Sequence, residues 1–218
     1  MNRFKPVMFV ILFGLVSACG TSETITRNSS FKTGGLTFAS EDRGARLQVD
    51  MRVEGISVTV PRSLKVSEAN RYLPSGDIVW RGDPRGDRHV QVGDIFEAGI
   101  AKGTSDLKGA TPVLVDIEVS RFHALSEKAR YTFGGVHNIN FFLTVRDAQS
   151  GQVLISRRHI RADLEGFGGD EALEAEAIGQ TQKVRITNHL ADVIYQELTT
   201  AEGFKNPQLG VIQAMNQI

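Results

Sequence analysis

Apolar and polar residues alternate along successive segments in the second half of the chain, and this alternation constrains the fold more than any other feature. It runs over residues 113–120, 139–145 and 153–164. A period of two is typical of β-strands with one buried face. The linker between the last two segments ends in Gly151, which favours a tight turn with this glycine in the left-handed conformation. We therefore expect these strands to form an antiparallel meander.

Further strands are predicted before and within this region. Residues 47–60 also alternate, with a change of apolar phase at Gly55, which is expected to mark a β-bulge or the junction of two strands. Residues 78–80 form a short apolar strand candidate. Tyr131 and Phe133 are expected to lead into the strand that contains residues 139–145.

Two helices are predicted, one between the strands and one after them. Asp87 is a candidate N-cap for a helix with apolar residues at three- to four-residue spacing as far as Ile100. A long helix is expected to begin with Asp170 as its cap and to reach Leu198. This element order predicts an α+β fold, a two-layer sandwich of a mainly antiparallel sheet with two main helices packed mostly on one face.

The last predicted helix carries two apolar stripes. The first stripe comprises Leu173, Ala177, Val184, Ala191, Tyr195 and Leu198. The second stripe comprises Ile186, Leu190 and Val193. One stripe is expected to pack on the sheet, and the second is either covered by the ends of the chain or docks a partner.

Residues 1–18 have the order of a secretory signal peptide, because Arg3 and Lys5 precede an apolar run that is followed by small residues. The apolar run is about half of the ~20 residues that a membrane-spanning helix needs. The sequence VSAC that ends at Cys19 resembles a bacterial lipobox, and the alternative is an ordinary signal peptide that ends beside a cysteine. We expect cleavage before Cys19 and attachment of lipid to its thiol.

The lipid on Cys19 would then tether the protein to a membrane through residues 19–35, a polar and flexible segment. Gly20 resembles the second residue of lipoproteins that are sorted to the outer membrane, so the expected location is the outer membrane, facing the periplasm. Residues 36–200 are assigned to a single α+β domain. Residues 201–218 are assigned to a C-terminal tail.

Charge and cysteine content exclude several classes of protein. Loss of residues 1–18 would leave 23 basic residues against 25 acidic residues, since Arg3 and Lys5 are removed from 25 basic residues. A formal net charge of −2 is not that of a nucleic-acid-binding protein. A single cysteine excludes an intramolecular disulfide framework and a multi-cysteine metal site.

No local motif predicts catalysis, a cofactor or a metal. The histidines are scattered singly and are His89, His123, His137, His159 and His189. They do not form the H-E-x-x-H pattern of a zinc site, and the chain has neither a G-x-S-x-G nucleophile motif nor a phosphate-binding loop. We therefore expect a protein that is not an enzyme and that needs no cofactor.

Two groups of polar residues are candidate binding sites. The first lies at a strand-to-helix junction and comprises Trp80, Arg81, Asp83, Arg85, Asp87 and His89. Such a junction can bind an anion through free backbone N–H groups. The alternative is a rigid turn that Arg–Asp pairs hold around a buried Trp80.

The second group lies on one face of the predicted meander and comprises Arg146, Arg157, His159 and Arg161. These side chains could bind a lipid phosphate or an acidic partner. The alternative is a solvated face of the sheet.

Four segments resemble a family of uncharacterised lipoproteins from alphaproteobacterial envelopes. They read IVWRGDPRGDRHVQV (residues 78–92), RFHALSEKARYTFGGVHNI (121–139), LTVRDAQSGQVL (143–154) and GQTQKVRITNHL (179–190). The element order is also similar, at the level of the fold, to that of accessory lipoproteins of transport and envelope-assembly systems. The expected anchor and tether, the absence of a catalytic motif and the second apolar stripe of the last helix together predict a non-enzymatic envelope protein that binds a partner. A periplasmic carrier of a lipid or small ligand is the alternative.

Overall fold

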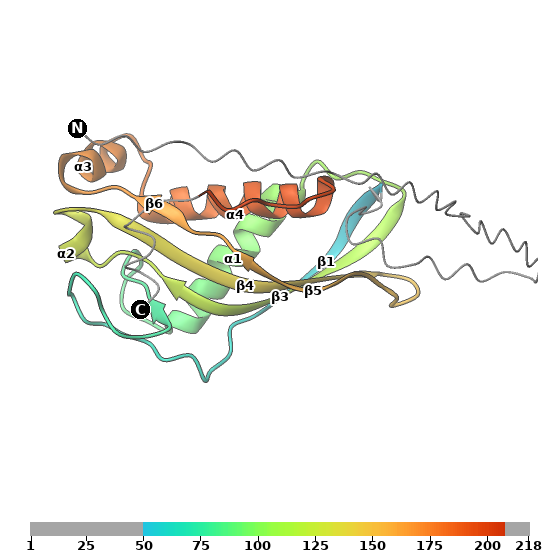
Figure 1. Ribbon diagram of the computed structural model, residues 1–218, viewed down its shortest axis with the longest axis horizontal. Helices are drawn as coiled ribbons and strands as arrows, with labels where there is room; N and C mark the ends of the chain where they lie inside the picture. The colour runs from blue at the N-terminus through green and yellow to red at the C-terminus, as the bar shows by residue number, and fades with distance from the viewer. Residues whose placement is uncertain (1–49, 208–218) are drawn as a thin grey trace, which may run out of the picture. The chain divides into compact units, whose positions relative to one another are not determined.

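A six-stranded β-sheet forms the centre of the computed structural model, which describes residues 50–207 (Figure 1). The strands are β1 (Met51–Thr59), β2 (Ile78–Val79), β3 (Thr111–His123), β4 (Gly135–Asp147), β5 (Val153–Arg161) and β6 (Leu164–Gly166). The main path is β1-β3-β4-β5, while β2 pairs with β3 and β6 pairs with β4.

The meander that the alternation predicts is present. Strand β4 pairs antiparallel with both β3 and β5, and Gly151 in the connecting turn has a φ of 72°. Strands β1 and β2 pair with β3 in parallel, so the chain crosses over between β1 and β3. The register of β1 shifts between Val53 and Gly55, which confirms the predicted bulge.

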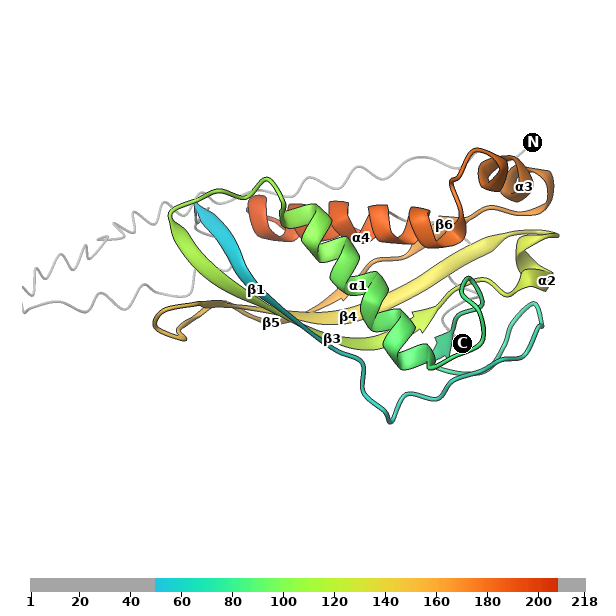
Figure 2. The same cartoon turned by 180° about the vertical axis from the view of Figure 1, so that it is seen from behind.

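Four helices accompany the sheet in the described part of the chain. They are α1 (Arg88–Thr104), α2 (Glu127–Arg130), α3 (Gly169–Ala177) and α4 (Gln182–Thr199). Helices α1 and α4 lie on one face of the sheet and pack against each other (Figure 2). The α+β two-layer arrangement with its main helices on one face is thus confirmed.

The core lies between the sheet and these two helices. Alternate residues of β3, among them Val115 and Val119, are fully buried there. The rings of Phe96 on α1 and Phe141 on β4 meet edge to face, with centroids 5.3 Å apart. Helix α4 completes the core with buried side chains that include Leu190.

The prediction of one long helix that Asp170 caps was wrong, because two helices occupy this region. Helix α3 begins after Gly168, and no side chain caps it. Gly179 then adopts a φ of 79°, which a helix cannot continue. The Oγ1 atom of Thr181 accepts a hydrogen bond from the N–H of Val184 at 3.3 Å and starts α4 in a new direction.

The interpretation of the second stripe as a docking surface was also wrong. Ile186, Leu190 and Val193 are fully buried and form the core face of α4. Val184 and Tyr195 of the first stripe are exposed instead. Ala191 and Leu198 of the first stripe are buried at the border of this core face.

Tyr131 and Phe133 lead into β4 as expected, and the segment that carries them follows a short helix that was not predicted. The Oγ atom of Ser126 accepts a hydrogen bond from the N–H of Ala129 and caps the short helix α2. The two aromatic residues occupy the turn between α2 and β4.

Residues 201–207 fold back onto α4, and the ring of Phe204 meets that of His189 with centroids 5.7 Å apart. None of the helices within residues 50–207 combines the length and apolar character needed to span a membrane. The predicted signal peptide, Cys19, the tether and the rest of the C-terminal tail lie outside the described residues.

Candidate functional site

The predicted site at the start of α1 is a rigid turn around a buried tryptophan. Trp80 is fully buried, and its Nε1 donates a hydrogen bond to Asp83 at 2.8 Å. Lys183 on α4 donates to the same carboxylate at 2.9 Å. Burial opposes ionisation of Asp83, but the hydrogen bonds from Lys183 and Trp80 outweigh it and hold the pKa of this carboxyl below its usual value.

The backbone N–H groups at the start of α1 are occupied by the side chain that caps the helix. One oxygen of Asp87 accepts hydrogen bonds from the N–H groups of His89 and Val90, which confirms Asp87 as the N-cap. Its other oxygen pairs with Arg62 at 2.6 Å. The carboxylate of Asp87 therefore occupies the position at the start of α1 that an anion would take. The loop has the structure of a rigid turn, and anion binding there stays a prediction.

The remaining residues of this loop also have structural contacts or face solvent. Arg81 pairs with Glu127 on α2 at 2.7 Å. The imidazole Nε2 of His89 lies 3.1 Å from the carbonyl oxygen of Leu64. Arg85 is exposed.

Sequence reasoning missed Arg88 in the same loop. It is buried beside this turn and pairs with Glu68 at 2.7 Å. It occupies the first position of a predicted helix, where a side chain is ordinarily solvated, so its burial could not be predicted from the sequence.

The second predicted group lies on the face of the sheet that α1 and α4 leave uncovered. Arg157 pairs with Glu118 at 3.1 Å and lies over the ring of Phe142 at 3.3 Å. His159 meets the same ring, with centroids 5.1 Å apart. Arg157 and His159 therefore both contact the ring of Phe142. This group of basic residues has the arrangement of a solvated face of the sheet.

The two other arginines of this group are paired with acidic residues. Arg146 pairs with Asp116 at 3.2 Å, and Arg161 lies 3.6 Å from the buried Asp163. Binding of an acidic partner or a lipid phosphate to this face stays a prediction.

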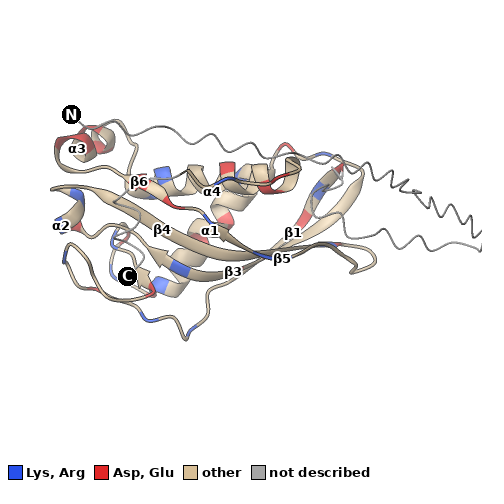
Figure 3. Ribbon diagram, in the orientation of Figure 1, with Lys and Arg blue, Asp and Glu red and all other residues tan. Residues whose placement is uncertain are grey.

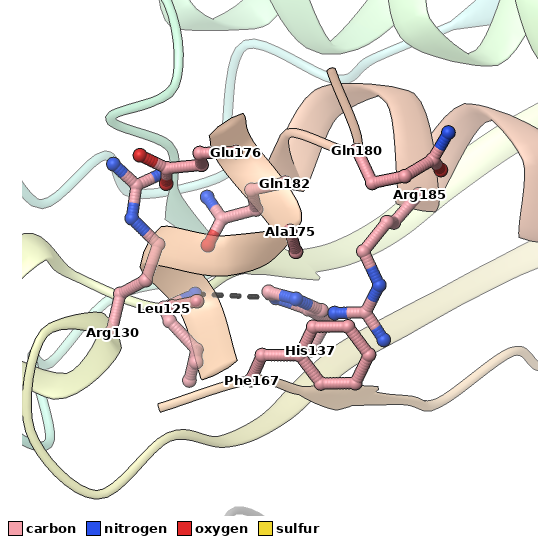
Figure 4. Close-up of a pocket in the computed structure, with 10 residues that line it drawn as sticks. Leu125, Arg130, His137, Phe167, Ala175, Glu176, Gln180, Gln182 and Arg185 are labelled. Carbon is pink, nitrogen blue, oxygen red and sulfur yellow. Dashed lines mark hydrogen bonds and ion pairs between the residues drawn. The ribbon is translucent and has the colours of Figure 1, made fainter. Parts of the chain in front are cut away.

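A polar pocket that the sequence did not predict lies where α2, α3 and α4 meet the start of β4 (Figure 4). We call it the α3–α4 pocket. Its free volume is about 10 Å³, which is close to the least space that one water molecule needs. Its polar lining consists of Arg130, His137, Glu176, Gln180, Gln182 and Arg185.

His137 forms the floor of the pocket and is 1% exposed. The backbone N–H of Leu125 donates to its Nδ1 at 3.3 Å, so the ring proton of the neutral imidazole lies on Nε2. Burial lowers the pKa of His137 to about 3, and the nearby Arg185, His189 and Arg130 act in the same direction. The imidazole is therefore uncharged at neutral pH.

Two arginines stand on opposite sides of His137 in the pocket (Figure 4). Arg130 pairs with Glu176 on α3 at 3.2 Å. Arg185 on α4 stacks on the ring of Phe167 at 3.3 Å and donates to the carbonyl oxygen of Glu165 at 2.9 Å.

An exposed group of apolar side chains adjoins this pocket, and we call it the aromatic cluster. It comprises Tyr72, Leu73, Tyr131 and Phe133, which are 44%, 63%, 43% and 83% exposed. The rings of Tyr72 and Phe133 lie 5.5 Å apart. Tyr131 connects the cluster to the pocket, because Arg130 lies over its ring and its hydroxyl is 3.4 Å from Glu176.

Closely packed glycines fix the turn that carries Phe133. Gly134 has a φ of 71°, in the left-handed region. A Cβ atom on Gly168 would lie 2.1 Å from the backbone nitrogen of Gly134. The backbone before β4 and the backbone before α3 are therefore in direct contact. Phe133 projects from this close contact between the two segments.

Sequence reasoning missed both of these features for identifiable reasons. The pocket draws Arg130, His137 and Arg185 from three separate elements, so no local spacing could reveal it. The glycine-rich sequences around Gly134 and Gly168 were the only local indication of the close contact beside the aromatic cluster.

Within residues 50–207, no group of three or more His, Cys, Asp or Glu side chains is arranged to hold a metal ion.

The fold and these features define an α+β two-layer domain with a polar pocket and an exposed aromatic cluster at one end. Residues 51–214 match the model of a family described as "Family of unknown function (DUF6778)". The match covers more than half of the chain, so the protein belongs to this family. The expected membership of an uncharacterised family is thereby confirmed.

Several solved structures resemble the domain at low sequence identity. A candidate lipoprotein from Caulobacter crescentus CB15 is 14% identical, with 66% of this chain and 88% of that chain covered and a TM-score of 0.35. Protein XCC0632 of the DUF330 family from Xanthomonas campestris is 13% identical, with 69% of this chain and 86% of that chain covered and a TM-score of 0.39. A PelC dodecamer from Paraburkholderia phytofirmans is 11% identical, with 70% of this chain and 90% of that chain covered and a TM-score of 0.31. No curated protein matches the chain.

Proposed function

We propose that the chain is a lipid-anchored protein of the bacterial cell envelope that acts as a non-enzymatic accessory protein by binding another envelope protein. The anchor is supported by the lipobox-like sequence that ends at Cys19 and by the signal-peptide pattern of residues 1–18. The proposed location is the outer membrane, with the domain in the periplasm.

The observation that carries partner binding is the exposure of Phe133. Burial of a phenylalanine side chain contributes about 1.5–3 kcal/mol, and this contribution is unused while the ring is 83% exposed. Aromatic residues and arginines are enriched among the residues that dominate protein interfaces. In the aromatic cluster, Lys128 lies over the ring of Tyr72, and Arg130 lies over the ring of Tyr131.

The position of the cluster fits a protein that is tethered by its N-terminal segment. The chain enters the sheet at Met51, at the end of the domain opposite to α2 and α3 (Figure 1, Figure 2). The aromatic cluster therefore lies at the end of the described domain opposite to Met51, where it is exposed to a partner.

A substitution of Phe133 tests this proposal. We expect Phe133→Ser to abolish recovery of a stoichiometric envelope protein after crosslinking in intact membranes, because the central apolar contact is lost. The matched control is Val153→Ser, which changes a 49% exposed apolar residue at the β4–β5 hairpin, outside the cluster. Equal recovery with both variants, or recovery of the protein alone from the wild type, would contradict the proposal.

The anchor is tested separately by metabolic labelling with a fatty acid. We expect label on the wild-type chain and none on Cys19→Ala, because Cys19 carries the only thiol of the chain. Label on both chains, or a mature protein that begins at another residue, would contradict the assignment.

A carrier of a small ligand is the second candidate, and one observation favours it. An open depression of about 360 Å³ lies beside the start of β1, the α1–β3 loop and the end of α4, with Met51, Leu107 and Leu198 among its lining residues. This volume falls within the range of small-molecule sites. Native mass spectrometry of the purified protein should then reveal a bound ligand, and a spectrum of the bare chain would count against this function.

A further inference from the structure

The second half of β1 is an uncharged edge of the sheet. Strand β3 pairs with one side of β1, and within residues 50–207 no other strand pairs with its outer side. The charged residues of β1 lie in its first half (Figure 3), and none follows Glu54 before the strand ends at Thr59. Edge strands that must not pair with another chain commonly carry charge. The segment from Gly55 to Thr59 lacks this protection.

The hydrophobic core is only partly covered along this edge. Ile56 and Val58 pack against the core but stay partly exposed. Their partners on β3 are Val115 and Ile117, which are 0% and 2% exposed. A partly exposed apolar row beside an unpaired edge favours a further strand as its neighbour, because that strand would cover the row and pair with the backbone.

We propose that β1 pairs antiparallel with β1 of a second copy of this chain, about a two-fold axis at Ser57. The two sheets then form one continuous sheet that carries the helices of both copies on the same face. In this register Ile56 lies opposite Val58 of the second copy. Ser57 lies opposite Ser57 of the second copy, and Gly55 lies opposite Thr59.

The strand is complementary to itself in this register. Apolar side chains meet on the face that the helices cover, and small or hydroxyl side chains meet on the other face. Favourable cross-strand pairs stabilise a sheet, and like charges that lie opposite each other destabilise it. No charged residue lies between Gly55 and Thr59, so the pairing brings no like charges together. The two-fold axis makes every contact occur twice, as in most homodimers.

The difference between the two edges of the sheet limits the assembly to two copies. At the other end of the main sheet path, β5 carries Arg157, Arg158, His159 and Arg161. Pairing along β5 would remove water from these charged side chains, which is costly. A molecule with one edge open to pairing joins one neighbour, and both open edges are then occupied. The association therefore closes as a dimer.

Disulfide formation across the two-fold axis tests this pairing. Residues directly opposite each other in an antiparallel pair have Cα atoms about 4.5–5.5 Å apart, within the range that a disulfide spans. We expect Ser57→Cys, in the full chain in its native membrane, to form a disulfide-linked dimer on mild oxidation. The matched control is Thr59→Cys, which is exposed on the same face. Its two copies would lie about 13 Å apart along the strands, at ~3.3 Å per residue, and should not link.

Tryptic digestion and mass spectrometry identify the linked residue, so any reaction of Cys19 is recognised separately. Equal linkage of the two cysteine variants, linkage of Ser57→Cys to a different protein, or no linkage of a folded Ser57→Cys chain would overturn the proposal. Limited proteolysis reports whether each variant is folded.

A charge at the axis provides a second test that needs no oxidation. We expect Ser57→Lys to lower the recovery of a second, differently tagged copy from the same membranes at least tenfold, because two lysines would lie opposite each other. Thr59→Lys, which would lie opposite Gly55, should retain most of this recovery. Equal recovery with both lysine variants would overturn the two-fold pairing. It would leave the effect of Phe133→Ser, and thus the aromatic cluster, untouched.

Discussion

At the scale of single residues, the presentation of Phe133 depends on glycines whose role is steric. Gly168 has a φ of −128°, a conformation that any residue can adopt. Its Cβ position is nevertheless blocked by the backbone of Gly134 at 2.1 Å. The need for glycine therefore arises from contact between two segments that are distant in the sequence, and the sequence alone does not reveal such a contact.

We expect Gly168→Ala to lower the free energy of unfolding by about 1–3 kcal/mol, because the new methyl group must displace backbone. The control is Gly93→Ala in α1, where a Cβ would meet Val60 at an ordinary 3.8 Å. That change should raise stability by roughly 0.5–1 kcal/mol, since alanine is the better helix former. Urea unfolding of both variants provides the measurement, and a shift of the same sign in both would contradict the steric explanation.

The candidate sites show what residue patterns can predict. Trp80, Asp83 and Asp87 were identified because a strand-to-helix junction concentrates polar residues within a few positions. Arg185 and Gln182 could not be identified, because their significance depends on burial and on neighbours from other elements.

At the scale of elements, the alternation of apolar and polar residues predicted the strands of the meander, whereas the helices were predicted only in part. The period of two predicted β3, β4 and β5, since one face of each packs on the helices. The division between α3 and α4 depended on the left-handed conformation of Gly179, which apolar periodicity does not report. The parallel pairing of β1 with β3 was not predicted either, because alternation does not specify strand partners.

Helix α4 provides a direct test of which stripe belongs to the core. Leu190 is fully buried against α1 and the sheet, whereas Tyr195 is 48% exposed. We expect Leu190→Ala to reduce the free energy of unfolding by about 2–5 kcal/mol, through lost burial and a cavity. Tyr195→Ala should change it by roughly 0.5 kcal/mol or less, as is usual for surface positions. Thermal or urea unfolding that ranks the two variants in the reverse order would refute this assignment of the core.

At the scale of the whole molecule, the buried His123 and His137 and the partly buried His189 make stability depend on pH. Burial lowers the pKa of His137 to about 3 and also lowers the pKa values of His123 and His189. Between the folded and unfolded pKa values, the unfolded chain binds more protons than the folded chain. The stabilisation is therefore complete above the unfolded value of about 6.5 and is lost as the pH falls towards the folded values.

We expect the free energy of unfolding to fall as the pH is lowered from about 6.5 to 4.5, by up to ~1.4 kcal/mol per pH unit for each histidine. Replacement of His137 by Asn removes one titrating group and should flatten this dependence. Urea unfolding at a series of pH values measures it. A wild-type chain whose stability is constant over this window would contradict the burial of uncharged histidines.

Strand β5 is the edge of the main sheet path in the described part of the chain, and it carries Arg157, Arg158, His159 and Arg161 within a few residues. An edge strand offers unpaired N–H and C=O groups that a second copy could join, and positive charge along the edge opposes such pairing. Arg157, Arg158 and Arg161 are each paired with a carboxylate of the same chain, so two copies could join along this edge only if these ion pairs lost their water. If the proposed anchor holds many copies on one membrane, the charged strand would oppose their aggregation.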